Sequence, residues 1–400
     1  MIKKISMVWM VLIVGLATAI GQKINIPRVI ADAETQTRLM LTEILKAKNN
    51  SPSLVSPHVL KKGKLELVPS GGWTSGFFPG ELWYLYELTG KKTWESEARK
   101  FTANIEKEKF NDGTNDMGFK IYCSFGNGYR LTNDAHYKDV IIQSAKTLAT
   151  RFNPKAGVIR SWDSYKNKWD YPVNIDNMMN LEILFEATKL KGDSSFYNIA
   201  VSHANQTLKN HFRPDFSSYH VVDYDTITSQ VIKKTTHQGY CDQSAWARGQ
   251  AWGLYGYVMC YRETRNKAYL QQAEHIASFI LHNPNMPPDL VPFWDLDAPH
   301  VTDEPRDASA AAITASALYE LSTYGKSNKK YKLTADKIIK SLTDNYRSPL
   351  GQNKGFILLH STGSKPSNSE IDVPIIYADY YFLESLLRKK KLDAGKKLLN

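Results

Sequence analysis

Two acidic residues, Asp116 and Asp176, each stand at the start of an apolar stretch with helical spacing. Asp116 lies in Asn-Asp-Met-Gly-Phe, and Asp176 lies in Asn-Ile-Asp-Asn-Met-Met-Asn-Leu. Two carboxylates held among Trp, Tyr, Asn and Gly suit acid and base work on a sugar, because one must hold a proton while the other stays charged. Asp is also a favoured helix N-cap, so each carboxylate has a structural interpretation as well. The residues around each carboxylate therefore have to decide between a catalytic role and a helix-capping role.

The segment from His237 to Trp252 is the richest in chemical groups. Its amide, guanidinium and indole side chains are Gln238, Trp246, Arg248 and Trp252, on or just before a helix for which Asp242 and Ser244 are candidate caps. Aromatic rings stack on the apolar face of a sugar, and Arg binds a carboxylate. A buried Arg is costly without an anion. Arg248 is therefore expected either to bind a sugar acid or to pair with Asp242 or another structural acid.

Three more side chains are candidates to line the same site. Trp73 precedes a helix in the Gly-rich segment Gly71–Trp83, and Trp162 lies in a loop ahead of Asp176. Both are predicted sugar platforms, with core packing as the alternative. His220 lies in a polar segment, where it either donates to substrate or pairs with Asp223 or Asp225.

The elements that must position these residues are helices. Apolar spacing is helical along most of the chain, and a polar turn, often followed by an aromatic residue, recurs between helical stretches. The turns are 88–94, 131–137, 190–197, 263–269 and 323–331, with a weaker sixth at 388–393. Six hairpins predict an all-α fold, an (α/α)6 barrel. The loops 155–174, 212–243 and 283–306 are expected to carry the site; a plain helical array that binds protein is the alternative.

The first residues predict export. Met-Ile-Lys-Lys and the apolar run that follows, ending in Ala-Thr-Ala, have the pattern of a secretory signal over residues 1–19. A single catalytic domain over 20–400 and a bacterial periplasmic location are the simplest expectations. After cleavage no stable membrane insertion is expected, since no other apolar run has the length to span a bilayer.

Composition limits the partners. The formal charge of +11 falls to +9 when Lys3 and Lys4 are removed with the signal, which favours an acidic partner. Lysines are scattered and not interleaved with aromatics, so no nucleic-acid partner is expected. Three cysteines without Cys-x-x-Cys spacing indicate no structural zinc site and no disulfide framework.

The combined motifs resemble the unsaturated glucuronyl hydrolases of glycoside hydrolase family 88. They are Trp-Thr-Ser-Gly-Phe-Phe-Pro-Gly, the two Asp motifs above, and His-Gln-Gly-Tyr-x-Asp-x-Ser-x-Trp-Ala-Arg-Gly-Gln-Ala-Trp, in that order between about Trp73 and Glu384. The resemblance independently implies an (α/α)6 barrel and no metal or organic cofactor. It implies as substrate an acidic di- or oligosaccharide with a 4,5-unsaturated uronic acid at its non-reducing end.

The resemblance also implies roles for single residues. Asp176 resembles the general acid/base, and Asp116 its carboxylate partner. His220, Gln238, Trp246, Arg248 and Trp252 resemble the lining of the unsaturated-sugar subsite, with Trp73 and Trp162 as platforms. In the family's mechanism the acid protonates C4 of the enol ether, C5 takes up water, and the hemiketal opens to release the rest of the chain. One departure is Asn115, where many relatives carry His, which bears on the charge state beside Asp116.

Near the C-terminus, His-Ser-Thr-Gly-Ser-Lys-Pro resembles a family loop that binds sulfate on the adjoining sugar. Ser361, Ser364 and Lys365 would supply the hydroxyls and the cation, and a solvated turn is the alternative. With the positive net charge, the loop tilts the expected substrate towards sulfated glycosaminoglycan disaccharides.

Three rival functions stay open at this point. An unsaturated rhamnogalacturonyl hydrolase of family 105 shares the fold and the chemistry but acts on pectin fragments. A toroid-fold polysaccharide lyase would use a Tyr with His or Asn, for which Tyr224 and His220 are candidates. A glycan-binding protein would leave the double bond untouched.

Overall fold

The computed structural model describes residues 24–48, 51–325 and 328–398. The predicted signal at 1–19 lies outside the described residues. No helix in the described part is long and apolar enough to cross a membrane.

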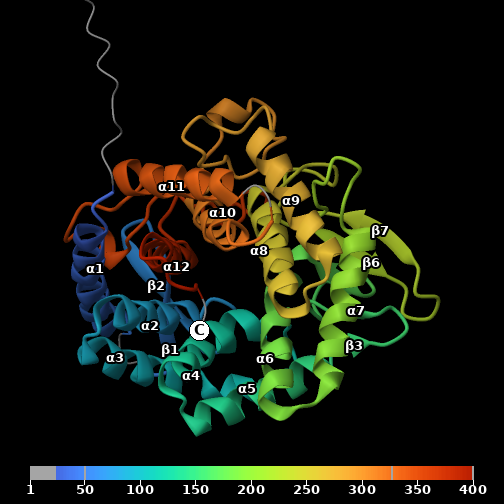
Figure 1. Cartoon of the computed structure of the whole chain (residues 1–400), viewed down its shortest axis with the longest axis horizontal. Coiled ribbons are helices and arrows are strands. Elements are labelled where there is room, and N and C mark those ends of the chain that lie inside the picture. Colours follow the sequence, from blue (N-terminus) through green and yellow to red (C-terminus); the bar gives the residue numbers. More distant parts are fainter. Residues whose placement is uncertain (1–23, 49–50, 326–327, 399–400) are drawn as a thin grey trace, which may run out of the picture.

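An inner ring of helices surrounds the axis of the molecule (Figure 1). Its members are α2 (Phe77–Thr89), the π-helix η2 (Gly118–Gly126) with α4 (Asn127–Thr132), α6 (Leu181–Lys191), α8 (Ala247–Thr264), α10 (Ala308–Leu321) and α12 (Ile376–Asp393). Each contacts the next along the chain, and α12 contacts α2, so the ring is closed. Helix α10 is buried all round, as its apolar sequence requires, and α12 is buried from Ile376 to Lys389 although Asp379, Glu384 and Arg388 are among the buried residues.

A second layer of helices covers the ring. These are α1 (Ile26–Ala47), α3 (Lys92–Ala103), α5 (Ala135–Ala149), α7 (Ser194–Asn210), α9 (Lys267–His282) and α11 (Asn328–Asn345). Helices α3, α5, α7, α9 and α11 each pack on the inner helix before them, and α1 packs beside α2. This double ring confirms the predicted (α/α)6 barrel.

Five of the six predicted turns join an inner helix to its outer partner. Four of these inner helices end on a left-handed residue, at Gly90, Asn133, Gly192 and Arg265, and that conformation lets the last carbonyls accept a backbone N–H. The sixth turn is wrong: residues 388–393 are the last turns of α12. A basic run suits a helix C-terminus. The sixth outer helix is the N-terminal α1.

Short strands and 3-10 turns gather where the inner helices begin. The hairpin β1 (Leu54–Lys61) and β2 (Lys64–Pro69) bridges through Val59 to Ile375, just before α12. Strand β3 (Phe152–Asn153) pairs with β4 (Val158–Ile159), and β5 (Pro172–Asn174), β6 (Val221–Tyr224) and β7 (Val231–Thr235) form an antiparallel sheet. The 3-10 helices are η1 (Glu106–Phe110), η3 (Ile175–Asn180), η4 (Val301–Asp303) and η5 (Asn353–Gly355).

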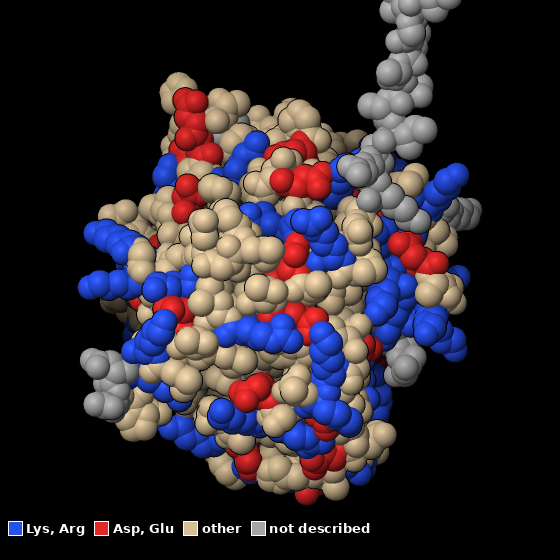
Figure 2. Space-filling view, turned by 90° about the vertical axis from the view of Figure 1, so that its left-hand side faces the viewer, with Lys and Arg blue, Asp and Glu red and all other residues tan. Residues whose placement is uncertain are grey.

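Charge is mixed over the surface side that Figure 2 shows. Lys and Arg side chains outnumber Asp and Glu there but alternate with them, without a continuous basic face. The positive net charge of the chain is thus spread over this side.

Candidate active site

A cavity of about 160 Å³ opens at the end of the barrel where the inner helices begin. It is lined by Trp73, Thr114, Asn115, Asp116, Phe119, Ser161, Trp162, Asn174, Asp176, Gln238 and Arg248. Six of the predicted site residues are in this set, although 175 residues separate the first from the last along the chain. The loops 155–174 and 212–243 both contribute, as expected. The loop 283–306 supplies no lining residue.

Asp176 is not a helix cap. It lies in the first turn of η3, whose N-cap position is Asn174, and its Oδ2 atom is buried with no hydrogen-bond partner among the described residues. Burial raises the pKa of Asp176 to about 7, against the opposing charge of Arg248 and with a small contribution from Asp116. Near neutral pH this carboxyl therefore exchanges a proton readily.

His220 faces Asp176 in a defined tautomer. The backbone N–H groups of His237 and Gln238 both donate to its Nδ1, at 3.1 Å each, so the ring proton is on Nε2. That Nε2 lies 3.6 Å from Oδ2 of Asp176. Burial holds the pKa of His220 well below its ordinary value, with the positive charges nearby acting in the same direction. His220 is thus a neutral donor directed at the acid, and not a partner of Asp223 or Asp225.

Asp116 is the second carboxyl in the cavity. Its Oδ2 accepts a hydrogen bond of 2.9 Å from the Thr114 hydroxyl, and it caps no helix. Burial raises the pKa of Asp116, while the charge of Lys120, then the hydrogen bond from Thr114 and then the charge of Arg151 act to lower it. The neighbouring Asn115 donates to Asn177 Oδ1 at 3.1 Å. The Asn that replaces the expected His thus adds no titratable group beside Asp116 and joins its segment to η3.

A glycine lets the two acidic segments approach each other. A Cβ on Gly118 would lie 2.4 Å from the Met179 carbonyl oxygen, which no side chain tolerates. The Gly118 backbone N–H donates to Asn180 Oδ1 at 2.8 Å. Helices η2 and η3 are therefore held in direct backbone contact, and this fixes Asp116 relative to Asp176.

Arg248 lies in the first turn of α8 and lines the cavity while pairing with a structural acid. Its Nη1 donates to Asp307 Oδ2 at 2.7 Å and to the Thr362 carbonyl at 2.6 Å, and its Nη2 donates to the Gly363 carbonyl at 2.6 Å. The acid is not Asp242, which accepts from the Thr236 backbone N–H. Three of five N–H donors are used, so Nε and one Nη2 proton are left for an anion in the cavity.

Three predicted lining residues, His220, Trp246 and Trp252, are not among the residues that line the cavity. Trp246 is the N-cap residue of α8 and is 2% exposed; its ring lies 4.5 Å from the His220 ring and 4.5 Å from the Arg248 guanidinium carbon. Trp252 is fully buried and packs on Phe119, with ring centroids 5.1 Å apart. Both indoles pack against residues that line the cavity and hold them in place. They are buried because neighbouring inner helices cover the faces of α8 from which they project.

Trp73, Trp162 and Gln238 are lining residues, as predicted. Trp73 packs on Phe119, with ring centroids 5.4 Å apart. Trp162 packs against Trp169 at 5.6 Å and His237 at 5.7 Å, which fixes its plane at the cavity wall. Gln238 Nε2 donates to the Gly363 carbonyl at 3.1 Å.

The loop 361–365 is tied to the cavity through its backbone. Ser361 is fully buried and pairs with Val373, so it cannot reach a substrate, which corrects the prediction. Ser364 donates to Ser367, and Lys365 forms an ion pair with Glu304 at the surface. A sulfate at Lys365 would therefore compete with Glu304.

Comparison with known proteins decides the family. Residues 56–384 match Glycosyl Hydrolase Family 88. The chain belongs to glycosyl hydrolase family 88. It is therefore a glycoside hydrolase of the unsaturated glucuronyl hydrolase family.

Three family relatives cover most of the chain. An "Unsaturated glucuronyl hydrolase" of Formosa agariphila is 54% identical over 348 residues, 86% of each chain. An "Unsaturated chondroitin disaccharide hydrolase" of Streptococcus pneumoniae is 32% identical over 79% of this chain and 81% of its own. The crystal structure of an unsaturated glucuronyl hydrolase specific for heparin is 45% identical, with a TM-score of 0.86 over 92% of this chain and 98% of its own.

Several residues of this family 88 site were not predicted. Asp307 is the N-cap of α10 and the buried partner of Arg248; an Asp ahead of Ala-Ser-Ala-Ala is a cap signal, but nothing in the sequence connects it to an Arg 59 positions away. Asn177 and Asn180 hold η3 against the Asn115 and Gly118 segment. Their position in the same motif as Asp176 is the sequence feature that could have identified them as site residues.

The geometry excludes Tyr224 as the catalytic tyrosine of a polysaccharide lyase. The Tyr224 hydroxyl accepts from Asn210 at 3.1 Å, and the ring is buried in a small cluster with Val158 and Tyr171. It is not among the residues that line the cavity.

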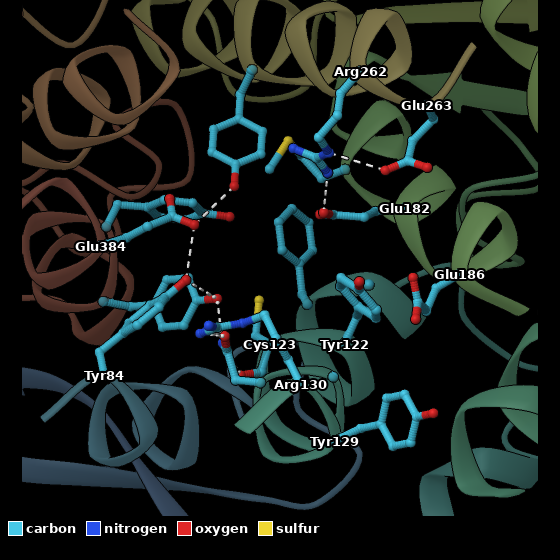
Figure 3. A pocket seen from close by; sticks show the side chains of 18 of the residues that line it. Tyr84, Tyr122, Cys123, Tyr129, Arg130, Glu182, Glu186, Arg262, Glu263 and Glu384 are labelled. Carbon is cyan, nitrogen blue, oxygen red and sulfur yellow. Dashed lines mark hydrogen bonds and ion pairs between the residues drawn. The ribbon is translucent and has the colours of Figure 1, made fainter. Parts of the chain in front are cut away.

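A larger cavity, of about 470 Å³, lies at the opposite end of the barrel (Figure 3). Its charged groups mostly pair with each other: Arg262 contacts Glu182, Glu263 and Glu320, and the Glu384 carboxylate accepts from Tyr84 and Tyr255. Phe119 lines both cavities and lies between them. None of the predicted site residues line this one. In this family 88 chain, the ion pairs and hydrogen bonds around this cavity hold the inner helices together.

Proposed function

We propose that the chain removes the 4,5-unsaturated uronic acid from the non-reducing end of lyase-generated glycosaminoglycan oligosaccharides. The observation that carries this proposal is Asp176, a buried carboxyl with a pKa of about 7 whose Oδ2 accepts no hydrogen bond from any described residue, in a cavity with Trp73, Asp116 and Arg248. An acid of that kind delivers a proton to a weakly basic carbon and takes another back. The aromatic wall and the free donors of Arg248 suit the ring and the carboxylate of a uronic acid.

The reaction balances without a further co-reactant. Asp176 donates its proton to C4, and the ring oxygen stabilises the positive charge that forms at C5. Water attacks C5 and gives a proton back to the Asp176 carboxylate. The C5 hemiketal then opens, leaving a ketone at C5, and the hemiacetal at C1 collapses to an aldehyde and the free hydroxyl of the next sugar. One water is consumed.

The neighbours of Asp176 fit these steps. Neutral His220 directs its Nε2 proton at Oδ2, which supports the carboxylate after proton transfer. Asp116 is the carboxylate partner that helps to position the substrate and its water. Arg248 offers Nε and Nη2 to the uronate carboxylate, since its other donors are held by Asp307 and two carbonyls.

Sulfated disaccharides are the proposed substrates. Among the relatives, one is described as specific for heparin and another as a chondroitin disaccharide hydrolase. The positive net charge and the Lys365 loop support an anionic sugar.

The test uses unsaturated disaccharides from chondroitin, heparin and hyaluronan, with a rhamnogalacturonan fragment as a fourth substrate. Hydrolysis removes the ultraviolet absorbance of the conjugated double bond, whereas a lyase acting on intact polysaccharide creates it. Loss of absorbance on a glycosaminoglycan disaccharide, absent in Asp176→Asn, supports the proposal. Action on the pectin fragment alone would replace it with the family 105 activity, and no action on any of the four would overturn it.

We also propose export to a bacterial periplasm, from the signal pattern at 1–19. Mass spectrometry of the mature N-terminus in a periplasmic fraction tests this. A mature chain that starts at Met1 in the cytoplasmic fraction contradicts it.

A further inference from the structure

The hairpin β1–β2 and the loop that precedes α12 meet beside the cavity. Leu60 donates its backbone N–H to the Pro374 carbonyl at 3.2 Å, next to the Val59–Ile375 bridge. Neither the hairpin nor residues 366–375 supply a residue to the cavity lining. Their polar side chains nevertheless connect to groups that do.

His58 and Glu370 form the polar contact between these two segments. His58 Nε2 lies 2.7 Å from Glu370 Oε1, and His58 Nδ1 lies 3.1 Å from the hydroxyl of Thr74, the residue after Trp73. The two side chains of the pair are only 13% and 21% exposed. Burial acts to raise the pKa of Glu370, but the hydrogen bond and charge of His58 keep it below its ordinary value. The pair is sheltered enough to hold a fixed geometry.

Glu370 is in turn attached to the acceptors of Arg248 and Gln238. Its carbonyl accepts from the Gly363 N–H at 2.7 Å, and its side chain packs so closely that a Cβ on Gly363 would lie 2.0 Å from Oε2. The Gly363 carbonyl accepts from Arg248 at 2.6 Å and from Gln238 at 3.1 Å. The Gly363 carbonyl therefore orients two lining side chains, and Glu370 holds the residue that carries this carbonyl through its backbone hydrogen bond and its carboxylate contact.

We propose that His58 and Glu370 are positioning residues for substrate binding, which set the Gly363 carbonyl and through it the direction of the free donors of Arg248 and Gln238. Through these contacts the pair links Thr74, next to the lining residue Trp73, to Gly363, which bonds the lining residues Arg248 and Gln238. This inference rests on the proposed function, since it assigns the pair to the binding of the uronate. Neither residue touches the substrate.

The expected consequence is a loss of affinity at unchanged chemistry. Glu370→Gln and His58→Gln each remove the ionic contact, let the Gly363 peptide shift, and misdirect the donors that bind the carboxylate. Since Asp176 and His220 are unaffected, kcat should stay within about twofold while KM rises roughly fivefold to twentyfold, as for the loss of one well-directed charged hydrogen bond. The double variant should lose no more affinity than His58→Gln alone, because that change already breaks both the Glu370 contact and the Thr74 contact.

The chain offers a matched control in the same loop. His360 and Asp372 also form a His–carboxylate pair at 2.7 Å, but their side chains are 44% and 53% exposed. Asp372→Asn should leave KM unchanged. All variants are compared by thermal unfolding, and Glu370→Asp, which keeps the charge, should recover part of the lost affinity.

The experiment measures kcat and KM on an unsaturated, unsulfated chondroitin disaccharide, with calorimetric binding of the same sugar in the Asp176→Asn background. Unchanged KM and binding in Glu370→Gln, or an equal loss in Asp372→Asn, would overturn the positioning role. A fall in kcat alone, or additive losses in the double variant, would do so as well. Failure of the wild-type protein to turn over any unsaturated disaccharide is a separate outcome, and it overturns the proposed function first.

Discussion

At the scale of the residue, the raised pKa of Asp176 couples activity to stability. Its folded-state pKa of about 7 exceeds the ordinary value of 3.8, so the folded protein holds this proton more tightly than the unfolded chain. The contribution is fully present at acid pH and is lost as pH rises towards about 7. Ionised Asp176 therefore destabilises the fold at alkaline pH.

Asp176→Asn is expected to lower turnover about a hundredfold or more, because the amide cannot cycle a proton. At pH 8 the same change should raise the free energy of unfolding, by up to a few kcal/mol at about 1.4 kcal/mol per pKa unit. At pH 5 the gain should be much smaller. Thermal melts at the two pH values check this; an equal effect at both would show that the carboxyl does not titrate in this range.

The wild-type rate should depend on the protonation state of Asp176. The acid form of Asp176 donates to C4, so kcat/KM is expected to fall above about pH 7, approaching about tenfold per pH unit. A pH–rate profile on an unsaturated disaccharide provides the measurement. A profile that stays flat to pH 9 would mean that another group supplies the proton.

Arg248→Lys should reduce kcat/KM by roughly tenfold or more, since an ammonium cannot bond Asp307 and two carbonyls while also presenting a fork to a carboxylate. Circular dichroism must show a normal fold for the comparison to count. Wild-type efficiency in a folded variant would leave Arg248 with its structural pairing alone.

At the scale of the element, the loop 361–365 carries the selectivity prediction. Lys365 pairs with Glu304 and is 36% exposed, so its contact with a sulfate is screened and modest. Lys365→Ala should lower kcat/KM on a sulfated disaccharide a few-fold to tenfold and spare the unsulfated one, an effect on the order of 1 kcal/mol. Higher salt should shrink the preference.

Glu304→Gln is the matched change, because it releases Lys365 without removing it. The preference for the sulfated sugar should then rise or stay the same. Equal losses on both sugars in Lys365→Ala would show that this loop does not read sulfate.

Sequence patterns located the acidic segments and the hairpins, because caps, turns and helical spacing are local properties. Burial around the ring is not local. Trp246 and Trp252 have the composition of a sugar subsite, yet the closure of α8 against its neighbours places them behind His220 and Phe119. The Asp307 partner of Arg248 and the pairing of α1 with the ring depend on contacts between distant segments. Turn residues and apolar spacing do not indicate such contacts.

At the scale of the whole molecule, the charge network at the far end of the barrel supplies stability. Arg262 of α8 is 12% exposed and pairs with carboxylates from α6, α8 and α10. Arg262→Met leaves Glu182 without its cation and removes one of two cations from Glu263 and from Glu320, which also pair with Lys189 and Arg388. The expected cost is about 3–5 kcal/mol, as for a broken buried pair. Urea unfolding tests this, with kcat/KM expected to stay near the wild-type value.

The control for Arg262 is Arg99→Met, since Arg99 also pairs with two carboxylates, Glu95 and Asp134, but is itself 37% exposed. Its cost should stay below about 1 kcal/mol. Equal costs for the two variants would contradict a special role of the far-end network.

The closed ring also sets the order of events during synthesis. Tyr84 of α2 bonds Glu384 of α12 across 300 positions of chain, so the inner wall lacks its last member until α12 has left the ribosome. Loop closure of this length is slow compared with local helix formation. The nascent polypeptide therefore carries finished hairpins with uncovered apolar flanks for most of its elongation time, and chaperone demand should peak just before α12 emerges.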